Sequence, residues 1–222
     1  MAESLGLDIA KNFVQKGSIA VDVGAGIYSG GADYVKALLN SVGEEGKVYA
    51  FDSFSIDTIP NAPNLIKVDK PVWSSSGKFK SEILFPWGIP VAMSTGKAPP
   101  QKDEYEAISL DDYFPTEKID FIKMDIEGAE SQALLGMKNL IDRSPNFRMI
   151  LECHWSYFNM FNKTNEDIWN FLQERPELHI CSLSVSQPFK LITKEEYFNI
   201  NLGSHILLTK DIIEPVIHGT TQ

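Results

Sequence analysis

The stretch VDVGAG, residues 21–26, decides the fold that this chain is expected to adopt. An apolar run over residues 18–23 leads into two glycines spaced two apart, and a helical pattern begins at about Ala32. A strand, a tight turn and a helix in this order are typical of the ligand-binding unit of an open α/β sheet. Gly24 and Gly26 have no Cβ, so a ligand can lie almost against the backbone, and the following helix offers free N–H groups. We therefore expect a ligand at this turn.

Length and composition favour one domain that spans residues 1–222. Apolar residues make up 43% of the chain, enough for a full core, and charged residues make up 23%, which is ordinary for a globular protein. The formal net charge is −10, and a surface of that sign repels phosphate backbones. Nucleic acid is therefore not an expected partner.

The sequence also predicts a cytoplasmic location without membrane contact. Residues 1–9 include Glu3 and Asp8 and no apolar core, which is unlike a signal peptide. No apolar run approaches the ~20 residues that a membrane-spanning helix needs. The two cysteines, Cys153 and Cys181, fit a reduced cytosolic protein.

Alternating strand and helix patterns predict a doubly wound sheet. Apolar β-type runs predict strands over residues 18–23, 47–52, 64–69, 119–125, 147–154 and 179–185. Helical periodicities predict helices over residues 5–14, 32–42, 127–141 and 165–174. Two further segments, 187–193 and 202–209, are expected to pair with each other as the antiparallel end of the sheet. The expected fold class is α/β and Rossmann-like, with a central, mostly parallel sheet of about seven strands and helices on both faces.

The middle of the chain departs from this pattern. Segments 78–85 and 104–110 resemble strands, and the segment 85–102 between them contains four prolines. Such a segment is typical of a long loop. It is either a surface insertion or a lid over the active site, with Trp87 and Met93 as apolar contacts.

Acidic residues follow the predicted parallel strands, at the edge where open α/β sheets bind their ligands. Asp22 is expected at the rim of the glycine turn, Asp52 ends the second strand, Asp125 ends the fourth, and Glu152 and His154 end the fifth. Carboxylates gathered at one edge repel one another, so a structural role alone explains them poorly. We therefore expect these side chains to form the functional site.

The spacing of glycines and acids indicates the cofactor. Asp52 stands 26 positions after Gly26, close to the roughly twenty that place an acid on ribose hydroxyls, although it could instead serve as a turn residue. A dinucleotide fingerprint needs a glycine where Ser29 stands, and no P-loop motif occurs. A glycine pair between two acids suits S-adenosylmethionine, whose methionine end carries an ammonium and whose sulfonium is positive.

Five motifs follow one another along the chain: VDVGAG (21–26), KVYAFD (47–52), ISLDDYF (108–114), IDFIKMDIEGAE (119–130) and MILECHW (149–155). In sequence and order they resemble the FkbM-like S-adenosylmethionine-dependent methyltransferases, over roughly residues 18–156 and more weakly in the final HILLTKD. The resemblance implies the class I methyltransferase fold and methyl transfer to a hydroxyl of a small molecule, sugar or secondary metabolite. Two departures are FDSF, where the family more often has Phe-Glu-Pro, and the insertion at 85–102, which leaves the acceptor open.

The resemblance implies a role in cofactor binding for residues at the matching positions. Asp22, Gly24 and Gly26 would hold the methionine end of S-adenosylmethionine, and Asp52 would hold its ribose. Asp69, or the residues just after it, would border the adenine.

The same resemblance places Asp125 and Glu127 next to the transferring methyl group. Glu130 is expected to have a structural role, since a negative charge is favourable near a helix N-terminus. An alcohol acceptor must also lose its proton, and His154, with an ordinary pKa of about 6.5, is the natural general base. His154 could instead fill the rim of the core, and Glu152 or Asp125 could orient it or act in its place.

A divalent metal is a second mechanistic option. Asp125, Glu152 and His154, with Glu127, offer oxygen and imidazole ligands from adjacent strand ends, which would suit Mg²⁺. Nothing in their spacing requires an ion.

Two other functions stay open beside a methyltransferase that acts on a small-molecule or carbohydrate acceptor. An NAD-linked oxidoreductase is disfavoured by Ser29 and by the absence of a Tyr-x-x-x-Lys pair. A non-catalytic scaffold domain that keeps the cofactor fold is the other.

Overall fold

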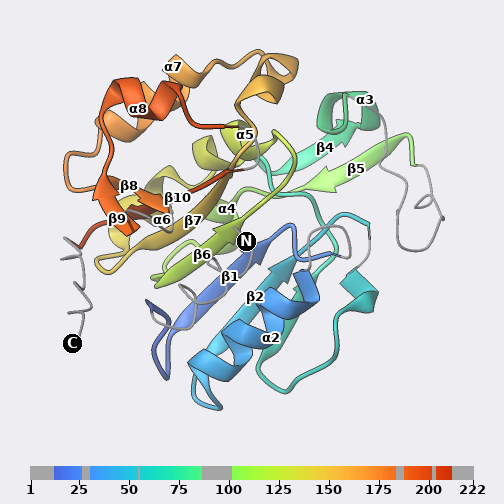
Figure 1. Cartoon of the computed structure of the whole chain (residues 1–222). Helices are drawn as coiled ribbons and strands as arrows, with labels where there is room; N and C mark the ends of the chain where they lie inside the picture. Colours follow the sequence, from blue (N-terminus) through green and yellow to red (C-terminus); the bar gives the residue numbers. More distant parts are fainter. Residues whose placement is uncertain are drawn as a thin grey trace, which may run out of the picture.

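The centre of the molecule is an eight-stranded sheet of order β3-β2-β1-β6-β7-β10-β8-β9 (Figure 1). The computed structural model describes residues 13–26, 31–54, 56–86, 102–183, 188–201 and 204–211. The strands of the large sheet are β1 (Ile19–Val23), β2 (Lys47–Phe51), β3 (Leu65–Val68), β6 (Phe121–Met124), β7 (Arg148–Cys153), β8 (His179–Leu183), β9 (Pro188–Leu191) and β10 (Ser204–Thr209). The strands β4 (Gly77–Lys80) and β5 (Glu104–Ala107) form a separate antiparallel pair.

Parallel pairing dominates this sheet. Strands β3, β2, β1, β6 and β7 are parallel neighbours, whereas β10 is antiparallel to both β7 and β8. The expected α/β, Rossmann-like class with a mostly parallel sheet is confirmed. The expected pairing of 187–193 with 202–209 is wrong, because β9 pairs with β8 and β10 lies between β7 and β8. The run Ile206–Leu208 is almost fully buried, which suits an interior strand with both faces covered.

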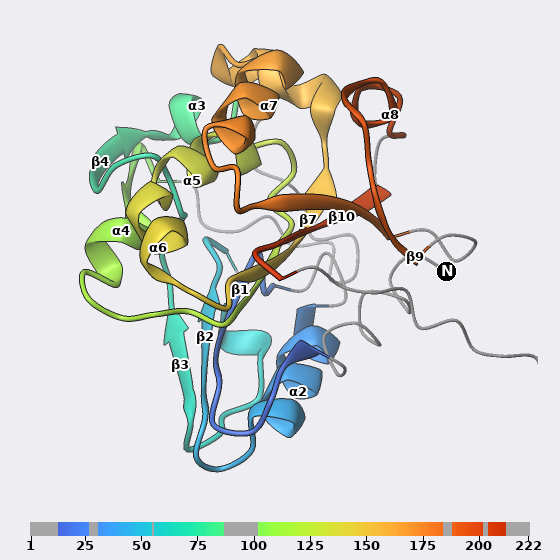
Figure 2. The same ribbon diagram turned by 90° about the vertical axis from the view of Figure 1, so that its left-hand side faces the viewer.

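Helices cover both faces of the sheet (Figure 2). The helical elements are α2 (Gly31–Val42), η2 (Ile56–Thr58), α3 (Ser81–Leu84), α4 (Leu110–Tyr113), α5 (Glu130–Leu135), α6 (Lys138–Arg143), η3 (Trp155–Phe161), α7 (Asn165–Gln173) and α8 (Lys194–Phe198). On one face, α2 buries Val35, Leu38 and Val42, whose spacing of three and four residues places them on one side of the helix. On the other face, α4, α5, α6 and α7 pack on a larger core. None of the described helices has the length and hydropathy needed to cross a bilayer.

The helix expected over 127–141 is divided into α5 and α6. The backbone of Gly136 lies against the loop after β3, so that a Cβ at this position would be 2.0 Å from the carbonyl oxygen of Trp73. The break between the two short helices lies at this close approach. The expected strand over 78–85 is also shorter, because β4 ends at Lys80 and α3 follows directly.

The β4–β5 hairpin rests on an aromatic cluster. Phe54, which follows β2, contacts Phe85 with ring centroids 4.7 Å apart and Tyr105 at 6.0 Å. Trp73 belongs to the same cluster and contacts Phe161, with ring centroids 5.4 Å apart. Most of the proline-rich segment 85–102, with Trp87 and Met93, lies outside the described residues, as does most of the helix expected over 5–14, so both stay predictions.

Gly24 is the backbone position on which this arrangement depends most directly. Its φ is +83°, and a Cβ there would lie 1.9 Å from the carbonyl oxygen of Asp125, just beyond the end of β6. We expect Gly24→Ala to lower the free energy of unfolding by about 3 kcal/mol or more, because the strain of the backbone and a steric clash add together. Chemical denaturation measures the loss.

The matched control is Gly17→Ala. Gly17 has nearly the same φ, +81°, but a Cβ at this position would have no atom within 4 Å. It should lose only the conformational part, about 1 kcal/mol. Equal losses in the two variants would contradict the role given to the contact between Gly24 and Asp125.

Candidate active site

The site lies where the strand order reverses, between β1 and β6. In open α/β sheets, ligands bind beyond the carboxyl ends of the strands at this point. Strand order places Asp69, Asp52, the glycine turn, Asp125 and Glu152 along one edge of the sheet, in that sequence. The structure thus brings the predicted acidic strand ends into one row.

The glycine turn is fixed from two sides. The backbone N–H groups of Gly24 and Ala25 both donate to the carbonyl oxygen of Phe51, at 2.9 and 3.1 Å. On the other side, Gly24 packs against the carbonyl of Asp125. The turn is therefore tied to the ends of both neighbouring strands. Ser29, whose presence disfavours a dinucleotide, lies outside the described residues.

Asp22 lies beneath the turn and not at its rim, which corrects the sequence-based expectation. Its side chain is 0% exposed and points to the α2 face of the sheet, where Lys123 Nζ is 3.6 Å from Asp22 Oδ1. Burial raises the pKa of Asp22 to about 6, although Lys123 opposes this shift. Neither carboxylate oxygen has a hydrogen-bond partner within the part of the chain that is described.

Lys123 is a residue of the site that sequence analysis did not identify. It lies inside β6, between apolar neighbours, and its side chain is 1% exposed. The sequence contained one indication of this residue, a lysine within the apolar run FIKM. A lysine buried in a strand requires a counter-charge nearby, and acidic residues were already expected at this edge of the sheet. That counter-charge is supplied by Asp22 and by Asp125, whose Oδ2 is 3.5 Å from Lys123 Nζ.

Asp52 and Asp69 occupy the other end of the row. Asp52 Oδ1 accepts a hydrogen bond of 2.7 Å from the Phe54 N–H, so this carboxylate does stabilise the turn after β2. Asp69 is exposed and borders a cavity of about 320 Å³ between the loop after β3 and the hairpin, where Lys78, Tyr105 and Glu106 also lie. Contact of Asp52 with a ribose and of Asp69 with an adenine stays a prediction.

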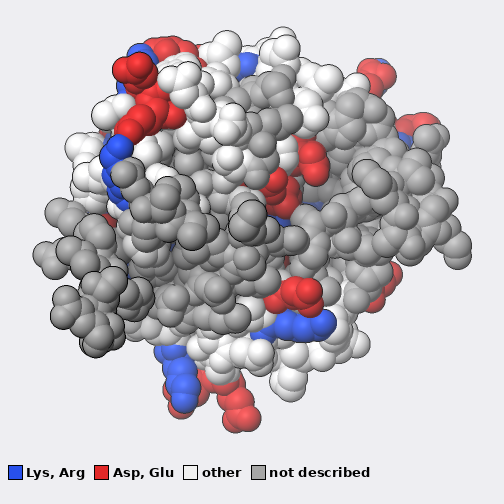
Figure 3. Space-filling view, viewed as in Figure 1, with Lys and Arg blue, Asp and Glu red and all other residues white. Residues whose placement is uncertain are grey.

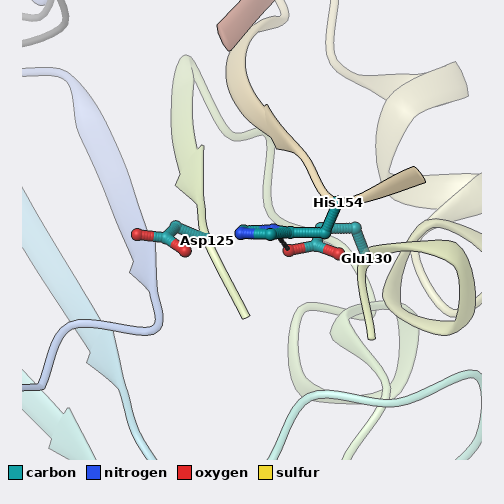
Figure 4. Close-up of side chains that lie close together, drawn as sticks. All are labelled: Asp125, Glu130 and His154. Atoms are coloured by element: carbon teal, nitrogen blue, oxygen red, sulfur yellow. Dashed lines mark hydrogen bonds and ion pairs between the residues drawn. The ribbon is translucent and has the colours of Figure 1, made fainter. Parts of the chain in front are cut away.

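His154 is held by Glu130. His154 Nδ1 lies 2.9 Å from Glu130 Oε1, and the same oxygen accepts a 2.9 Å hydrogen bond from the Ile126 N–H (Figure 4). Glu130 is fully buried, so its expected structural role is accompanied by a second one, the orientation of the imidazole. This leaves His154 Nε2 facing Glu127 Oε2 at 3.5 Å and Glu152 Oε1 at 3.6 Å.

Protons are unevenly distributed within this cluster. Burial opposes a charge on His154, but the hydrogen bond and charge of Glu130, with Glu152 and Asp125, raise its pKa to about 9. Burial and the adjacent Asp125 raise the pKa of Glu152 to about 8. Burial would also raise the pKa of Asp125, but Lys123 and the hydrogen bond from Glu152 outweigh it and lower that pKa. At neutral pH, His154 and Glu152 are therefore protonated and Asp125 is ionised.

His205 is a second histidine of the site that sequence analysis missed. It is the register partner of Glu152 in the β7–β10 pair, and its Nε2 lies 3.6 Å from Glu152 Oε2. Glu152 is therefore placed between the imidazoles of His154 and His205. Burial lowers the pKa of His205, so this ring is neutral at pH 7. No sequence pattern indicates this contact, because it depends on β10 lying beside β7.

Glu127 has a left-handed backbone, with φ of +56°. Its side chain is 61% exposed, and its carboxylate reaches toward His154 from the open side of the cluster. Burial raises the pKa of Glu127 above its ordinary value, although His154 opposes the shift. In the space-filling view, acidic side chains reach the surface near the middle of this side of the molecule (Figure 3).

The side chains that could converge on a metal differ from the expected set. Asp125, Glu130 and His154 each offer a ligand atom, and these atoms lie within 4.8 Å of one another. The hydrogen bond between Glu130 and His154 already explains their closeness. A metal held by Asp125, Glu152 and His154 therefore stays a prediction.

The raised pKa of His154 makes stability depend on pH. A pKa raised from 6.5 to about 9 contributes stability that is fully present below pH 6.5 and is lost as the pH rises through 9. Glu152 acts in the same direction up to about pH 8. We expect the free energy of unfolding to fall between pH 7 and 9, and Glu130→Gln to make this fall shallower by lowering the pKa of His154 by about one unit or more.

Denaturation at several pH values and NMR titration of the His154 ring measure the two effects. Glu166→Gln serves as the control, because Glu166 is an exposed residue paired with Lys194 on the surface. An unchanged His154 titration in Glu130→Gln would contradict the hydrogen-bond assignment.

Comparison with known proteins identifies the family of the chain and structures that share its fold. The model of the methyltransferase FkbM domain matches residues 22–176, and no curated protein matches the chain significantly. The structure of the methyltransferase FkbM from Methylobacillus flagellatus KT is 17% identical to this chain, with a TM-score of 0.53. The match covers 87% of this chain but 44% of that one, so this chain spans less than half of that structure's length. A putative rRNA-methylase from Clostridium thermocellum is 14% identical with a TM-score of 0.52, over 93% of each chain, and both likenesses show a shared fold. Because the family match covers more than half of its residues, this chain belongs to the FkbM methyltransferase domain family.

Proposed function

We propose that this protein binds S-adenosylmethionine and transfers its methyl group to a hydroxyl of a small molecule or sugar. The observation that carries the proposal is the placement of two groups at one switch point of the sheet. The glycine turn and Asp52 lie on one side of it, and the cluster of Asp125, Glu152 and His154 lies on the other. Family membership supports the same reaction class.

The residues around the turn fit this cofactor in charge. Asp22 and Asp125 bring two carboxylates to Lys123, a single cation, which leaves an excess of negative charge beneath the turn. That excess suits a methionine end with an ammonium and a sulfonium better than it suits a pyrophosphate. Gly24 and Gly26 would border this end, and Asp52 the ribose.

S-adenosylmethionine supplies, when bound, a methyl group activated on a positively charged sulfur. The protein therefore has to position the acceptor and manage one proton. We assign Asp125 and Glu127 to the side of the reacting methyl. We assign His154 to the proton of the acceptor hydroxyl, a role that it can fill only after losing its own proton, so methylation should speed up as the pH rises toward 9. Nδ1 of His154 is bonded to Glu130, so the reacting nitrogen would be Nε2. Asp125, which is ionised at neutral pH, would orient His154 or accept the proton in its place, and Glu152 would accept it only above about pH 8.

Charge favours a small acceptor over nucleic acid. The formal net charge is −10, and the exposed carboxylate of Glu127 lies 3.5 Å from His154 Nε2 on the open side of the site. An acceptor that carries phosphates would be repelled by the net charge and by Glu127. Although one structure of similar fold is described as a putative rRNA-methylase, these charges favour a neutral or cationic acceptor for the present chain.

Calorimetric titration with S-adenosylhomocysteine, and with NAD for comparison, tests the cofactor. We expect micromolar binding of S-adenosylhomocysteine alone. Asp52→Ala should weaken it by about tenfold or more, because two ribose hydrogen bonds to a charged group are lost. Asp57→Ala, which changes an exposed aspartate on η2, should leave affinity unchanged. Unchanged affinity in Asp52→Ala would refute the ribose role, and binding of NAD would favour an oxidoreductase.

His154→Ala tests the proton-transfer role. With an acceptor found by screening hydroxylated compounds and RNA for methylation, we expect a rate about 100-fold lower at unchanged S-adenosylhomocysteine affinity, the typical effect of losing a general base. His179→Ala, at the start of β8, should leave the rate unchanged. Normal turnover by His154→Ala would make His154 structural. Cofactor binding by the wild type without methylation of any acceptor would instead favour a scaffold domain.

A further inference from the structure

Lys123 is a charged side chain placed inside a central strand. Its strand neighbours Phe121, Ile122 and Met124 are fully buried, and its own side chain is 1% exposed. Burying a charge in such surroundings is strongly unfavourable unless partners compensate for it. An apolar residue of similar length would fill the same space without that cost, so the charge itself requires an explanation.

The contacts of Lys123 join three elements at the carboxyl edge of the sheet. Its Nζ lies 3.6 Å from Asp22 Oδ1 on β1 and 3.5 Å from Asp125 Oδ2, just beyond β6. The same ammonium donates a hydrogen bond of 3.2 Å to the carbonyl oxygen of Gly24. It also stands 5.3 Å from the centre of the Tyr34 ring on α2. The ammonium of Lys123 therefore contacts β1 and the glycine turn after it, the helix α2, and Asp125 at the end of its own strand β6.

The ammonium is charged in this position. Burial opposes the charge, but the carboxylates of Asp22 and Asp125 outweigh burial and raise the pKa of Lys123 above its ordinary value. Without this charge, Asp22 and Asp125 would face each other as two buried carboxylates. Their repulsion would displace the one that is free to move, and Asp125, at 8% exposure, is nearer the surface than Asp22.

Burial prevents Lys123 from contacting a ligand directly. We propose that Lys123 is a positioning residue of the cofactor site, which holds the Gly24 carbonyl and the Asp125 carboxylate in the one arrangement that accepts the methionine end of S-adenosylmethionine. This inference rests on the proposed function. According to this inference, the buried ion pairs of Lys123 keep the glycine turn and Asp125 in fixed positions relative to each other.

The test compares Lys123→Met with Arg175→Met. Arg175 is a matched control, because it too is a buried cation with a carboxylate partner, Asp142 at 2.9 Å, a carbonyl acceptor, Phe171 at 2.8 Å, and an aromatic ring at 4.2 Å. It links α6 to the end of α7, at the opposite edge of the sheet from the glycine turn. Both variants should unfold at lower temperature than the wild type.

The decisive measurement is the affinity for S-adenosylhomocysteine at a temperature where each variant is folded. We expect Lys123→Met to bind about tenfold more weakly or worse, because small displacements of positioning groups have effects of this size, and Arg175→Met to bind as the wild type does. Wild-type affinity in Lys123→Met would overturn the proposal. An equal loss in Arg175→Met would also overturn it, because general loosening would then explain both.

A double variant, Asp22→Asn with Lys123→Met, keeps the proposal testable if the single variant does not fold. Removing both members of a buried pair is far less destabilising than removing one. Asp22→Asn alone is the reference, because Asp22 itself contributes charge to the site. Binding by the folded double variant that is weaker than that of Asp22→Asn supports the positioning role, and equal affinity in the two would show that Lys123 only neutralises Asp22. Absence of binding by the wild type would refute the proposed function, and the positioning role with it.

Discussion

The pairing of β1 with β6 is the constraint on which the rest of the structure depends. These strands are adjacent although almost 100 residues separate them in the chain, and the order of the sheet reverses between them. Their ends approach so closely that Gly24 and the Asp125 carbonyl leave no room for a side chain. The same pairing sets Asp22 directly beside Lys123 in register, so the backbone contact and the ion pairs depend on each other.

A second consequence of the strand order is a row of polar side chains on one face of an otherwise apolar sheet. Asp22, Lys123, Glu152 and His205 come from four successive strands, β1, β6, β7 and β10. Each has a neighbour of complementary chemistry, which reduces the cost of burying it. His154, which is held by Glu130, contacts this row at Glu152. The protonation states of the proposed site therefore depend on buried residues as well as on those that a ligand would touch.

The sequence predicted the central strands within one or two residues, because buried parallel strands are continuous apolar runs bounded by turns. It also located Asp52, Asp125, Glu152 and His154 at strand ends. It placed Asp22 wrongly at a rim, because the burial of that carboxylate depends on Lys123, which is 101 positions away. The place of β10 and the contact of His205 with Glu152 were missed for a related reason, since local patterns contain no information on which strands become neighbours.

The backbone of Glu127 has a consequence for how the chain can vary. An L-residue with φ of +56° is less stable there than glycine by about 1 kcal/mol. Selection for folding alone would therefore favour glycine at this position, next to the glycine already present at 128. Under selection for folding alone, Glu127 would be replaced early, whereas the buried core residues Leu151 and Ile122 would be kept. The range of substitutions that position 127 accepts therefore distinguishes the requirements of folding from the requirements of the site.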